Sequence, residues 1–201
     1  MLPYTIETTI QGTAPLLQHQ FPLAALAGLQ EGARRKSGSP DYTGEWIDRM
    51  YASDGRLYQP ASHLEAAMAR AAANFRIAGS RTRTYRDLFR AYVIVEPEEV
   101  PLLWEGTPIP APGPELLQLP TPALRVDIRR AVVNRAAIAR ARLRIAAGWQ
   151  LRFTIAVHDS QIRPDVVQTI LQDAGIAAGI GDYRPRFGRF AVCAWSVRSP
   201  A

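Results

Sequence analysis

Hydrophobic and polar residues alternate along three stretches of the chain, as they do in a β-strand that buries one face. In residues 4–11, Ile6 and Ile10 alternate with threonines and a glutamate. In residues 149–157, apolar side chains alternate with Gln, Arg and Thr, and residues 190–197 are rich in β-branched and aromatic side chains. Each of the three stretches is predicted to be a strand.

Two other stretches carry apolar residues at the spacing of a helix. The first, residues 62–76, begins with Ser62 and Glu65, which are spaced as a capping box. Its apolar stripe consists of Leu64, Met68, Ala71 and Phe75. The second helix is predicted to begin at Pro164, a residue favoured in the first turn, and to stop at Gly175. Its stripe consists of Val166, Val167, Ile170, Leu171 and Ala174.

The regions between these elements are predicted to be less regular. Residues 13–60 follow no clear period and are interpreted as one long insertion. Residues 76–86 form a basic linker, and residues 91–95 form a strand that Pro97 ends. Residues 97–122 are rich in proline, which cannot donate to a β-ladder, so an extended linker is expected there rather than core.

The most basic part of the chain, residues 125–144, mixes arginines with apolar residues. Val126 and Ile128 alternate with polar residues, which indicates a strand. The following segment, AAIARARLRI, is compatible with a helix by propensity or with a strand by the alternation of its arginines. We favour a two-stranded arm.

The predicted elements follow the order strand, helix, strand, inserted arm, strand, helix, strand. This is the βαββαβ pattern of the ferredoxin-like fold, which belongs to the α+β class. We therefore expect one domain over residues 1–201, with an insertion at 13–60 and a proline-rich and basic β-hairpin arm at 97–148. Two helices would cover one face of the sheet and leave the other open, as in RNA-recognition modules.

Composition adds a preference for an anionic partner. The chain carries 24 basic and 18 acidic residues, a net charge of +6, and its 47% of hydrophobic residues suffices for a core. Lys36 is the only lysine, and arginine suits phosphate recognition because its planar fork donates bidentately. A GC-rich genome would produce the same bias, so the distribution of the charge has to decide between the two explanations.

Several other classes of protein are disfavoured. Cys193 is the only cysteine, which excludes an intramolecular disulfide and a cysteine-based metal cluster. No stretch reaches the roughly 18 apolar residues that a membrane span needs, and residues 1–10 do not resemble a secretory leader. We expect a cytoplasmic protein with no membrane partner, no metal and no cofactor.

Residues 179–189 form a glycine-rich loop with properties of a phosphate site. Glycines let backbone N–H groups approach a phosphate, arginines supply charge, and Tyr183 and Phe187 are candidates for stacking on bases. The structural alternative is a strained turn, in which Gly179 and Gly181 satisfy positive φ angles and the aromatic residues belong to the core.

Three basic segments are therefore candidates for nucleic-acid contact: a cluster within the insertion, the arm and the glycine-rich loop. A solvated charged face is the alternative for the arm, but the arm contains only one carboxylate, Asp127, between residues 125 and 144. The predicted contact residues are Arg34, Arg35, Lys36, Arg125, Arg129, Arg130, Arg135, Arg140, Arg142, Arg144, Gly179, Gly181, Tyr183, Arg184, Arg186 and Arg189.

The leading strand followed by GTAPLLQHQF, the proline-rich and basic insertion after the second strand, and the tail GIGDYRPRFGRFAV resemble the RAMP superfamily of CRISPR effector proteins. The resemblance is to the backbone subunits that coat guide RNA. It implies a modified ferredoxin-like palm, a β-hairpin thumb and a glycine-rich segment before the last strand. Residues 13–60 leave room for only a reduced finger region, as in a minimal effector subunit or a phage or mobile-element relative.

This resemblance implies sequence-independent binding of single-stranded guide RNA, with copies of the chain and other effector subunits as partners and a complementary target strand as a further one. We expect no enzymatic activity, because no catalytic or metal motif is recognisable. Two alternatives remain: a guide-processing endoribonuclease with His19 as general base, and a phage-encoded protein whose basic surface binds another protein. Asp48 and Asp54 are further, weaker candidates for a cleavage function.

Overall fold

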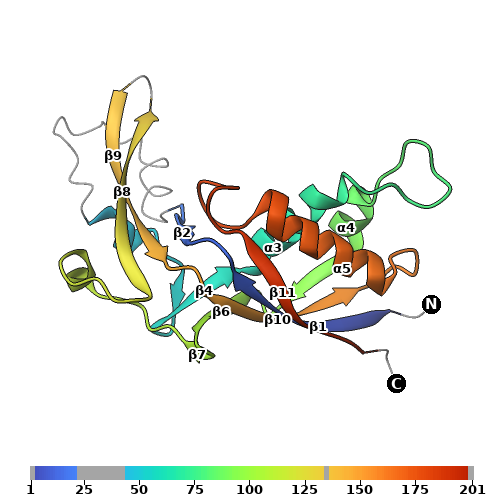
Figure 1. The fold of residues 1–201 in the computed structure, drawn as a ribbon, viewed down its shortest axis with the longest axis horizontal. Coiled ribbons are helices and arrows are strands. Elements are labelled where there is room, and N and C mark those ends of the chain that lie inside the picture. The colour runs from blue at the N-terminus through green and yellow to red at the C-terminus, as the bar shows by residue number, and fades with distance from the viewer. Residues whose placement is uncertain (1–2, 22–43, 134–135, 199–201) are drawn as a thin grey trace, which may run out of the picture.

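The computed structural model describes residues 3–21, 44–133 and 136–198. Within these residues, eight strands form the main sheet and three form a smaller one. The path through the main sheet is β11-β1-β10-β6-β4-β3, with β5 paired to β10 and β7 paired to β6. All strand pairs are antiparallel, so the predicted α+β class with an antiparallel sheet is confirmed (Figure 1).

The strands of the main sheet are β1 (Tyr4–Gly12), β3 (Ala52–Ser53), β4 (Arg56–Pro60), β5 (Val93–Glu96), β6 (Glu99–Trp104), β7 (Thr107–Pro108), β10 (Gln150–Val157) and β11 (Phe190–Arg198). The helical segments are α2 (Glu45–Asp48), α3 (Ala61–Ala72), α4 (Arg86–Tyr92), the short η1 (Pro114–Leu117), α5 (Pro164–Asp173) and the wider turn η2 (Ala174–Ala178). The helices α3, α4 and α5 lie on the same side of the main sheet (Figure 1).

The core lies between the main sheet and its helices. Ile6 and Ile10 of β1 face this layer together with their cross-strand neighbours Ile155 and Leu151 of β10, and all four are fully buried. The helices contribute Leu64, Met68, Val167, Ile170 and Leu171, which are also fully buried. The alternation seen in β1 therefore has the expected cause, because every second side chain enters the core.

The opposite face of β1 and β10 is polar. Thr5, Glu7 and Thr9 alternate with the buried residues of β1, and Thr154 and Arg152 lie opposite Glu7 and Thr9 on β10. None of these five side chains is aromatic, so this part of the sheet does not offer the base-stacking platform of an RNA-recognition module. The sheet face is thus a poor candidate for base contacts.

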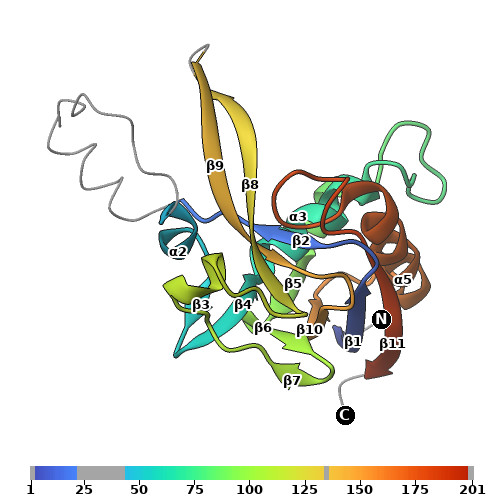
Figure 2. The ribbon, with the colours of Figure 1, turned by 60° about the vertical axis from the view of Figure 1, so that its left-hand side comes forward.

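The smaller sheet has the order β2-β9-β8, with β2 (Leu16–Gln18), β8 (Leu124–Val133) and β9 (Ala136–Ile145). The strands β8 and β9 form a long hairpin that projects from the body of the protein (Figure 2). Gln18 of β2 is fully buried, donates to the Tyr58 carbonyl at 2.7 Å and accepts from the Tyr51 N–H at 3.1 Å. The base of the hairpin is thereby fixed to β4, and the predicted two-stranded arm is confirmed.

The predicted strands at 4–11, 149–157 and 190–197 are confirmed as β1, β10 and β11. The helix predicted from Pro164 is confirmed at its start but not at its end, because the chain continues through Gly175 as η2. A Cβ at Gly175 would lie 2.2 Å from the Phe190 carbonyl oxygen. This glycine therefore allows η2 to pack closely on β11, and Gly179, with φ of 66°, ends the helical segment instead.

The predicted capping box at Ser62 and Glu65 is wrong. The N-cap of α3 is Pro60, and no side chain caps the helix. The Glu65 carboxylate instead accepts a hydrogen bond from the Val95 N–H at 2.9 Å, which ties α3 to β5. The helix also ends at Ala72, so Phe75 lies beyond it.

Three segments predicted to be irregular contain regular elements. The basic linker runs into α4, which also takes the first two residues of the strand expected at 91–95. The proline-rich range contains β6, whose Val100 and Leu102 are fully buried. Pro101 pairs only with β4, so its missing N–H interrupts no second ladder. The predicted insertion at 13–60 contains β2 and β4.

Candidate nucleic-acid interface

The register of the hairpin gathers most of its arginines on one face. Arg125, Asp127 and Arg129 of β8 lie opposite Arg144, Arg142 and Arg140 of β9, and residues directly opposite each other share a face. These six residues are the arginine face. On the other side of the hairpin, Leu124, Ala141, Leu143 and Ile145 are buried in the core. The alternation of arginine with apolar residues thus separates a charged face from an anchoring one.

The glycine-rich loop, residues 179–189, packs on the arginine face. Arg142 Nε donates to Asp182 Oδ2 at 2.5 Å, and its guanidinium lies 4.7 Å from the centre of the Tyr183 ring. Arg129 lies over Phe187, with 4.7 Å between the guanidinium carbon and the ring centre, and also pairs with Asp127. Loop and hairpin therefore form one surface, although 40 residues separate the partners of the central ion pair.

Arg142 is largely withdrawn from solvent by these contacts. The residue is only 6% exposed, and its Nη1 atom is buried without a hydrogen-bond partner in the described part of the chain. Burying a guanidinium is costly unless a carboxylate compensates it, and Asp182 supplies that charge. This geometry gives Arg142 the role of holding the loop on the hairpin.

A second carboxylate joins the hairpin to the short helix α2. Glu45 forms ion pairs with Arg49 at 2.7 Å and with Arg140 of the arginine face. Arg49 in turn donates to His19 Nε2 at 3.0 Å. Arg140 is thus held on the side of the hairpin where α2 lies. Neither Glu45 nor Asp182 was predicted as a partner, because each lies far along the chain from the arginine it contacts.

His19 lies within this charged cluster. Burial, followed by the positive charges of Arg49 and Arg142, lowers the pKa of His19 below its ordinary value of 6.5. Its Nε2 accepts the hydrogen bond from Arg49, and its Nδ1 is buried without a partner among the described residues. The arrangement favours a neutral imidazole that takes part in packing at the base of the hairpin.

The glycines of the loop serve its conformation. Gly179 and Gly181 have φ angles of 66° and 76°, and a Cβ on Gly181 would lie 2.6 Å from the Leu17 carbonyl oxygen. The N–H of Gly179 donates to the Ala174 carbonyl, and that of Asp182 donates to the Leu17 carbonyl. These backbone donors are used within the protein. Gly179 and Gly181 therefore shape the loop, and its exposed charged side chains are candidates for contacting an anion.

The two aromatic residues of the loop differ in exposure. Phe187 is buried under Arg129, whereas Tyr183 is 38% exposed and lies beside both Arg129 and Arg142. The structural alternative to base stacking thus describes Phe187. Tyr183 keeps part of its ring accessible.

Five of the predicted arginines are exposed and have no carboxylate partner within residues 3–21, 44–133 and 136–198. They are Arg125 and Arg130 of β8, and Arg184, Arg186 and Arg189 of the loop. Arg125 and the three loop arginines are the accessible cations of the interface, whereas Arg130, which pairs with Ala139, lies on the opposite face of the hairpin. The remaining predicted residues Arg34, Arg35, Lys36 and Arg135 lie outside the described residues.

Arg125 and Arg144 also line a cavity at the base of the hairpin. Its volume is about 640 Å³, and Pro15, Pro120 and Pro122 lie on its other walls. The two arginines are direct cross-strand neighbours, and Arg144 Nε is buried without a hydrogen-bond partner among the residues described. Like charges placed opposite each other repel, so an anion in this cavity would relieve an unfavourable contact.

No group of three or more His, Cys, Asp or Glu side chains among the described residues is arranged to hold a metal ion. Among the described helices, none is long and apolar enough to cross a membrane.

The comparisons with known proteins support the fold. No protein-family model matches the chain, and no curated protein sequence does. Among solved structures, a chain in the cryo-EM structure of the Type III-B Cmr-beta bound to cognate target RNA matches with a TM-score of 0.55 and 13% identity. The match covers all of this chain and 62% of that chain, so this protein spans about three fifths of its length. At this identity the likeness concerns the fold.

Proposed function

We propose that this protein binds single-stranded RNA without sequence preference, as a repeating backbone subunit of a CRISPR-type ribonucleoprotein complex. The main support is the joined surface of hairpin and loop, in which four exposed arginines lack a carboxylate partner among the described residues while partly buried ion pairs fix the scaffold beneath them. The fold likeness to a chain of an assembly bound to target RNA agrees with this proposal.

The palm in this proposal is ferredoxin-like. The order β11-β1-β10-β5 is the 4-1-3-2 order that a βαββαβ chain gives when its strands are numbered along the sequence. The helix α3 lies between β1 and β5 in the sequence, and α5 lies between β10 and β11. The hairpin is inserted between the second and third strands of this palm. This is the position of the thumb that the resemblance to RAMP proteins implies.

The arginines of the interface divide into two groups in this proposal. The exposed residues Arg125, Arg184, Arg186 and Arg189 contact RNA phosphates on the joined surface, and Arg130 contacts one from the opposite face of the hairpin. Arg144 joins Arg125 in the cavity at the base of the hairpin. Arg129, Arg140 and Arg142 position these contacts through Asp127, Glu45 and Asp182. Arginine contacts to phosphates carry no sequence information, so the bases stay free to pair with a target strand.

We also propose that the protein has no catalytic role toward RNA. The nitrogen of His19 that would take a proton, Nε2, already accepts a hydrogen bond from Arg49. A general base needs a free lone pair within reach of the substrate hydroxyl. His19 therefore supports the base of the hairpin.

The test is RNA affinity measured by fluorescence anisotropy with a homopolymeric single-stranded RNA over a range of salt concentrations. The double variant R184Q/R186Q should bind at least about tenfold more weakly, and the slope of its salt dependence should fall by about 0.7 for each phosphate that the variant no longer neutralises. The control R81Q/R83Q removes the same charge from two exposed arginines between α3 and α4. It should retain the affinity and salt dependence of the unmodified protein.

If both variants bound RNA equally weakly, only the net charge of the protein would matter and not the position of the arginines, which would overturn the proposal. Size-exclusion chromatography with light scattering on longer RNAs gives a second readout, since a coating subunit should add more copies as the RNA lengthens. Binding that survives high salt, with a protein rather than RNA as the ligand, would favour the alternative of a protein-binding surface.

A further inference from the structure

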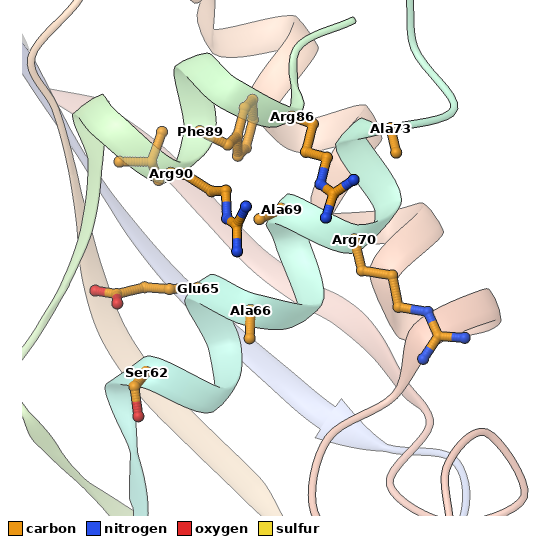
Figure 3. A pocket seen from close by; sticks show the side chains of 10 residues that line it. Ser62, Glu65, Ala66, Ala69, Arg70, Ala73, Arg86, Phe89 and Arg90 are labelled. Atoms are coloured by element: carbon orange, nitrogen blue, oxygen red, sulfur yellow. The ribbon is translucent and has the colours of Figure 1, made fainter.

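A second basic site lies between α3 and α4, on the helical side of the main sheet and apart from the hairpin (Figure 1). The cavity there has a volume of about 590 Å³. That volume falls in the range of about 300–1,000 Å³ that is typical of small-molecule sites. Figure 3 shows Arg86 and Arg90 extending from α4 towards α3, whereas the side chain of Arg70 on α3 extends away from them at the edge of the cavity.

The charges of this cavity are unpaired within the described residues. Arg70, Arg86 and Arg90 are exposed, and none of them forms an ion pair or hydrogen bond with a described side chain. The cavity contains one carboxylate, Glu65, but that group accepts a hydrogen bond from the Val95 N–H and points towards β5 (Figure 3). The cavity is therefore strongly positive.

Sequence spacing makes this cluster unfavourable without a ligand. Arg86 and Arg90 are four residues apart on α4, a distance at which like charges on a helix repel. Beside Glu65, the facing side of α3 carries Ala66 and Ala69, and these two positions offer neither a compensating charge nor a bulky side chain to fill the space. The guanidinium groups of Arg86 and Arg90 beside this open volume, with Arg70 at its edge, are a favourable arrangement for a phosphate, which accepts bidentate hydrogen bonds.

We propose that this cavity binds a terminal phosphate group, separately from the hairpin and loop. A terminal phosphate carries up to about two negative charges and three acceptor oxygens, which matches the two guanidinium groups of Arg86 and Arg90 better than the single charge of a phosphodiester does. Two sources share this chemistry: a free nucleotide or the 5′-phosphate at the end of an RNA strand. The cavity volume is large enough for a free nucleotide or for the first nucleotide of an RNA strand.

The experiment compares ligands that differ only in the phosphate. Isothermal titration calorimetry of the full chain with adenosine triphosphate, pyrophosphate and adenosine tests a free ligand, and 5′-phosphorylated and 5′-hydroxyl forms of one oligonucleotide test an RNA end. The double variant R86Q/R90Q should weaken binding of the phosphorylated ligands at least about tenfold, since charge-assisted hydrogen bonds are the strong ones. The control R81Q/R83Q, which removes the same charge outside the cavity, should not.

Each outcome decides the proposal. Binding of adenosine triphosphate and pyrophosphate that disappears only in R86Q/R90Q supports a free phosphorylated ligand, and a 5′-phosphate preference that disappears in the same variant supports an RNA end. The absence of any binding, equal affinity for adenosine, or equally weakened binding in both variants overturns it. Affinity for 5′-hydroxyl RNA should be unchanged in R86Q/R90Q, so failure here is distinct from failure of the hairpin interface.

Discussion

Arginines in two regions of this protein have different electrostatic surroundings. At the hairpin and loop, Arg140 and Arg142 are paired with Glu45 and Asp182, and the neighbouring exposed arginines lie on a scaffold that these pairs fix. The α3–α4 cavity is lined by three arginines with no carboxylate partner among the described residues. Residue type alone therefore does not assign a role, because a paired arginine holds structure whereas an unpaired cluster is available to an external anion.

The largest difference between the two regions is expected from alanine at their glycines. Gly188 of the loop and Gly79 of the α3–α4 connection have similar φ angles of 71° and 78°. A Cβ on Gly188 would lie 1.7 Å from the Ile180 carbonyl oxygen, whereas a Cβ on Gly79 meets nothing within 4 Å. G188A should lower the free energy of unfolding by at least about 4 kcal/mol, and G79A by only about 1 kcal/mol.

Urea denaturation of both glycine variants measures this difference. A soluble G188A protein with the stability of G79A would show that the loop can move off the hairpin at little cost. The rigid support assumed for Arg184 and Arg186 would then be absent. If G188A does not fold, G79A still reports the conformational cost alone.

The next largest effect concerns the ion pair beneath the loop. D182N keeps the Oδ1 acceptor that receives the Tyr183 N–H but removes the charge that compensates buried Arg142. We expect the free energy of unfolding to fall by about 2–3 kcal/mol. This is less than for a fully buried pair, because the Asp182 side chain is 34% exposed. The measurement is again urea denaturation.

D165N is the matched control for this substitution. Asp165 pairs with Arg163 at the same distance of 2.5 Å, but both side chains are mostly exposed. Solvent screens such a pair, so D165N should leave the unfolding transition nearly unchanged. Equal effects of the two substitutions would contradict the structural role assigned to Arg142.

The sequence predicted those elements whose pattern is local. The alternation of β1, β10 and the hairpin, and the apolar stripe of α5, each follow from neighbouring residues, and all are present in the structure. The strand β6 was missed because prolines argue against a strand, and only its position beside β4 and β10 explains how Pro101 is tolerated. The spacing of Glu65 from Ser62 suggested a helix cap, but in the structure its carboxylate accepts a hydrogen bond from β5 instead.

The candidate sites were predictable to different degrees. The arginine-rich hairpin and the glycine-rich loop were both identified, yet their mutual contact depends on Arg142 and Asp182, which are distant in sequence. The α3–α4 cavity was missed entirely. The sequence pattern placed Arg86 in a linker, and nothing local indicates that α4 turns Arg86 and Arg90 towards α3.

The smallest predicted effect is that removal of one arginine charge from the α3–α4 cavity stabilises the protein. R86Q relieves the repulsion between Arg86 and Arg90 and removes a positive charge from the first residue of α4, so without added ligand it should stabilise the protein by roughly 0.3 kcal/mol. Removal of a paired charge at the loop instead destabilises the protein. Saturating pyrophosphate should reverse the order, because a ligand that binds only the folded state adds stability in proportion to its affinity. Thermal unfolding with and without pyrophosphate measures both signs. If R86Q is destabilised to the same extent in either condition, Arg86 acts through packing, and the contrast between the two regions does not hold.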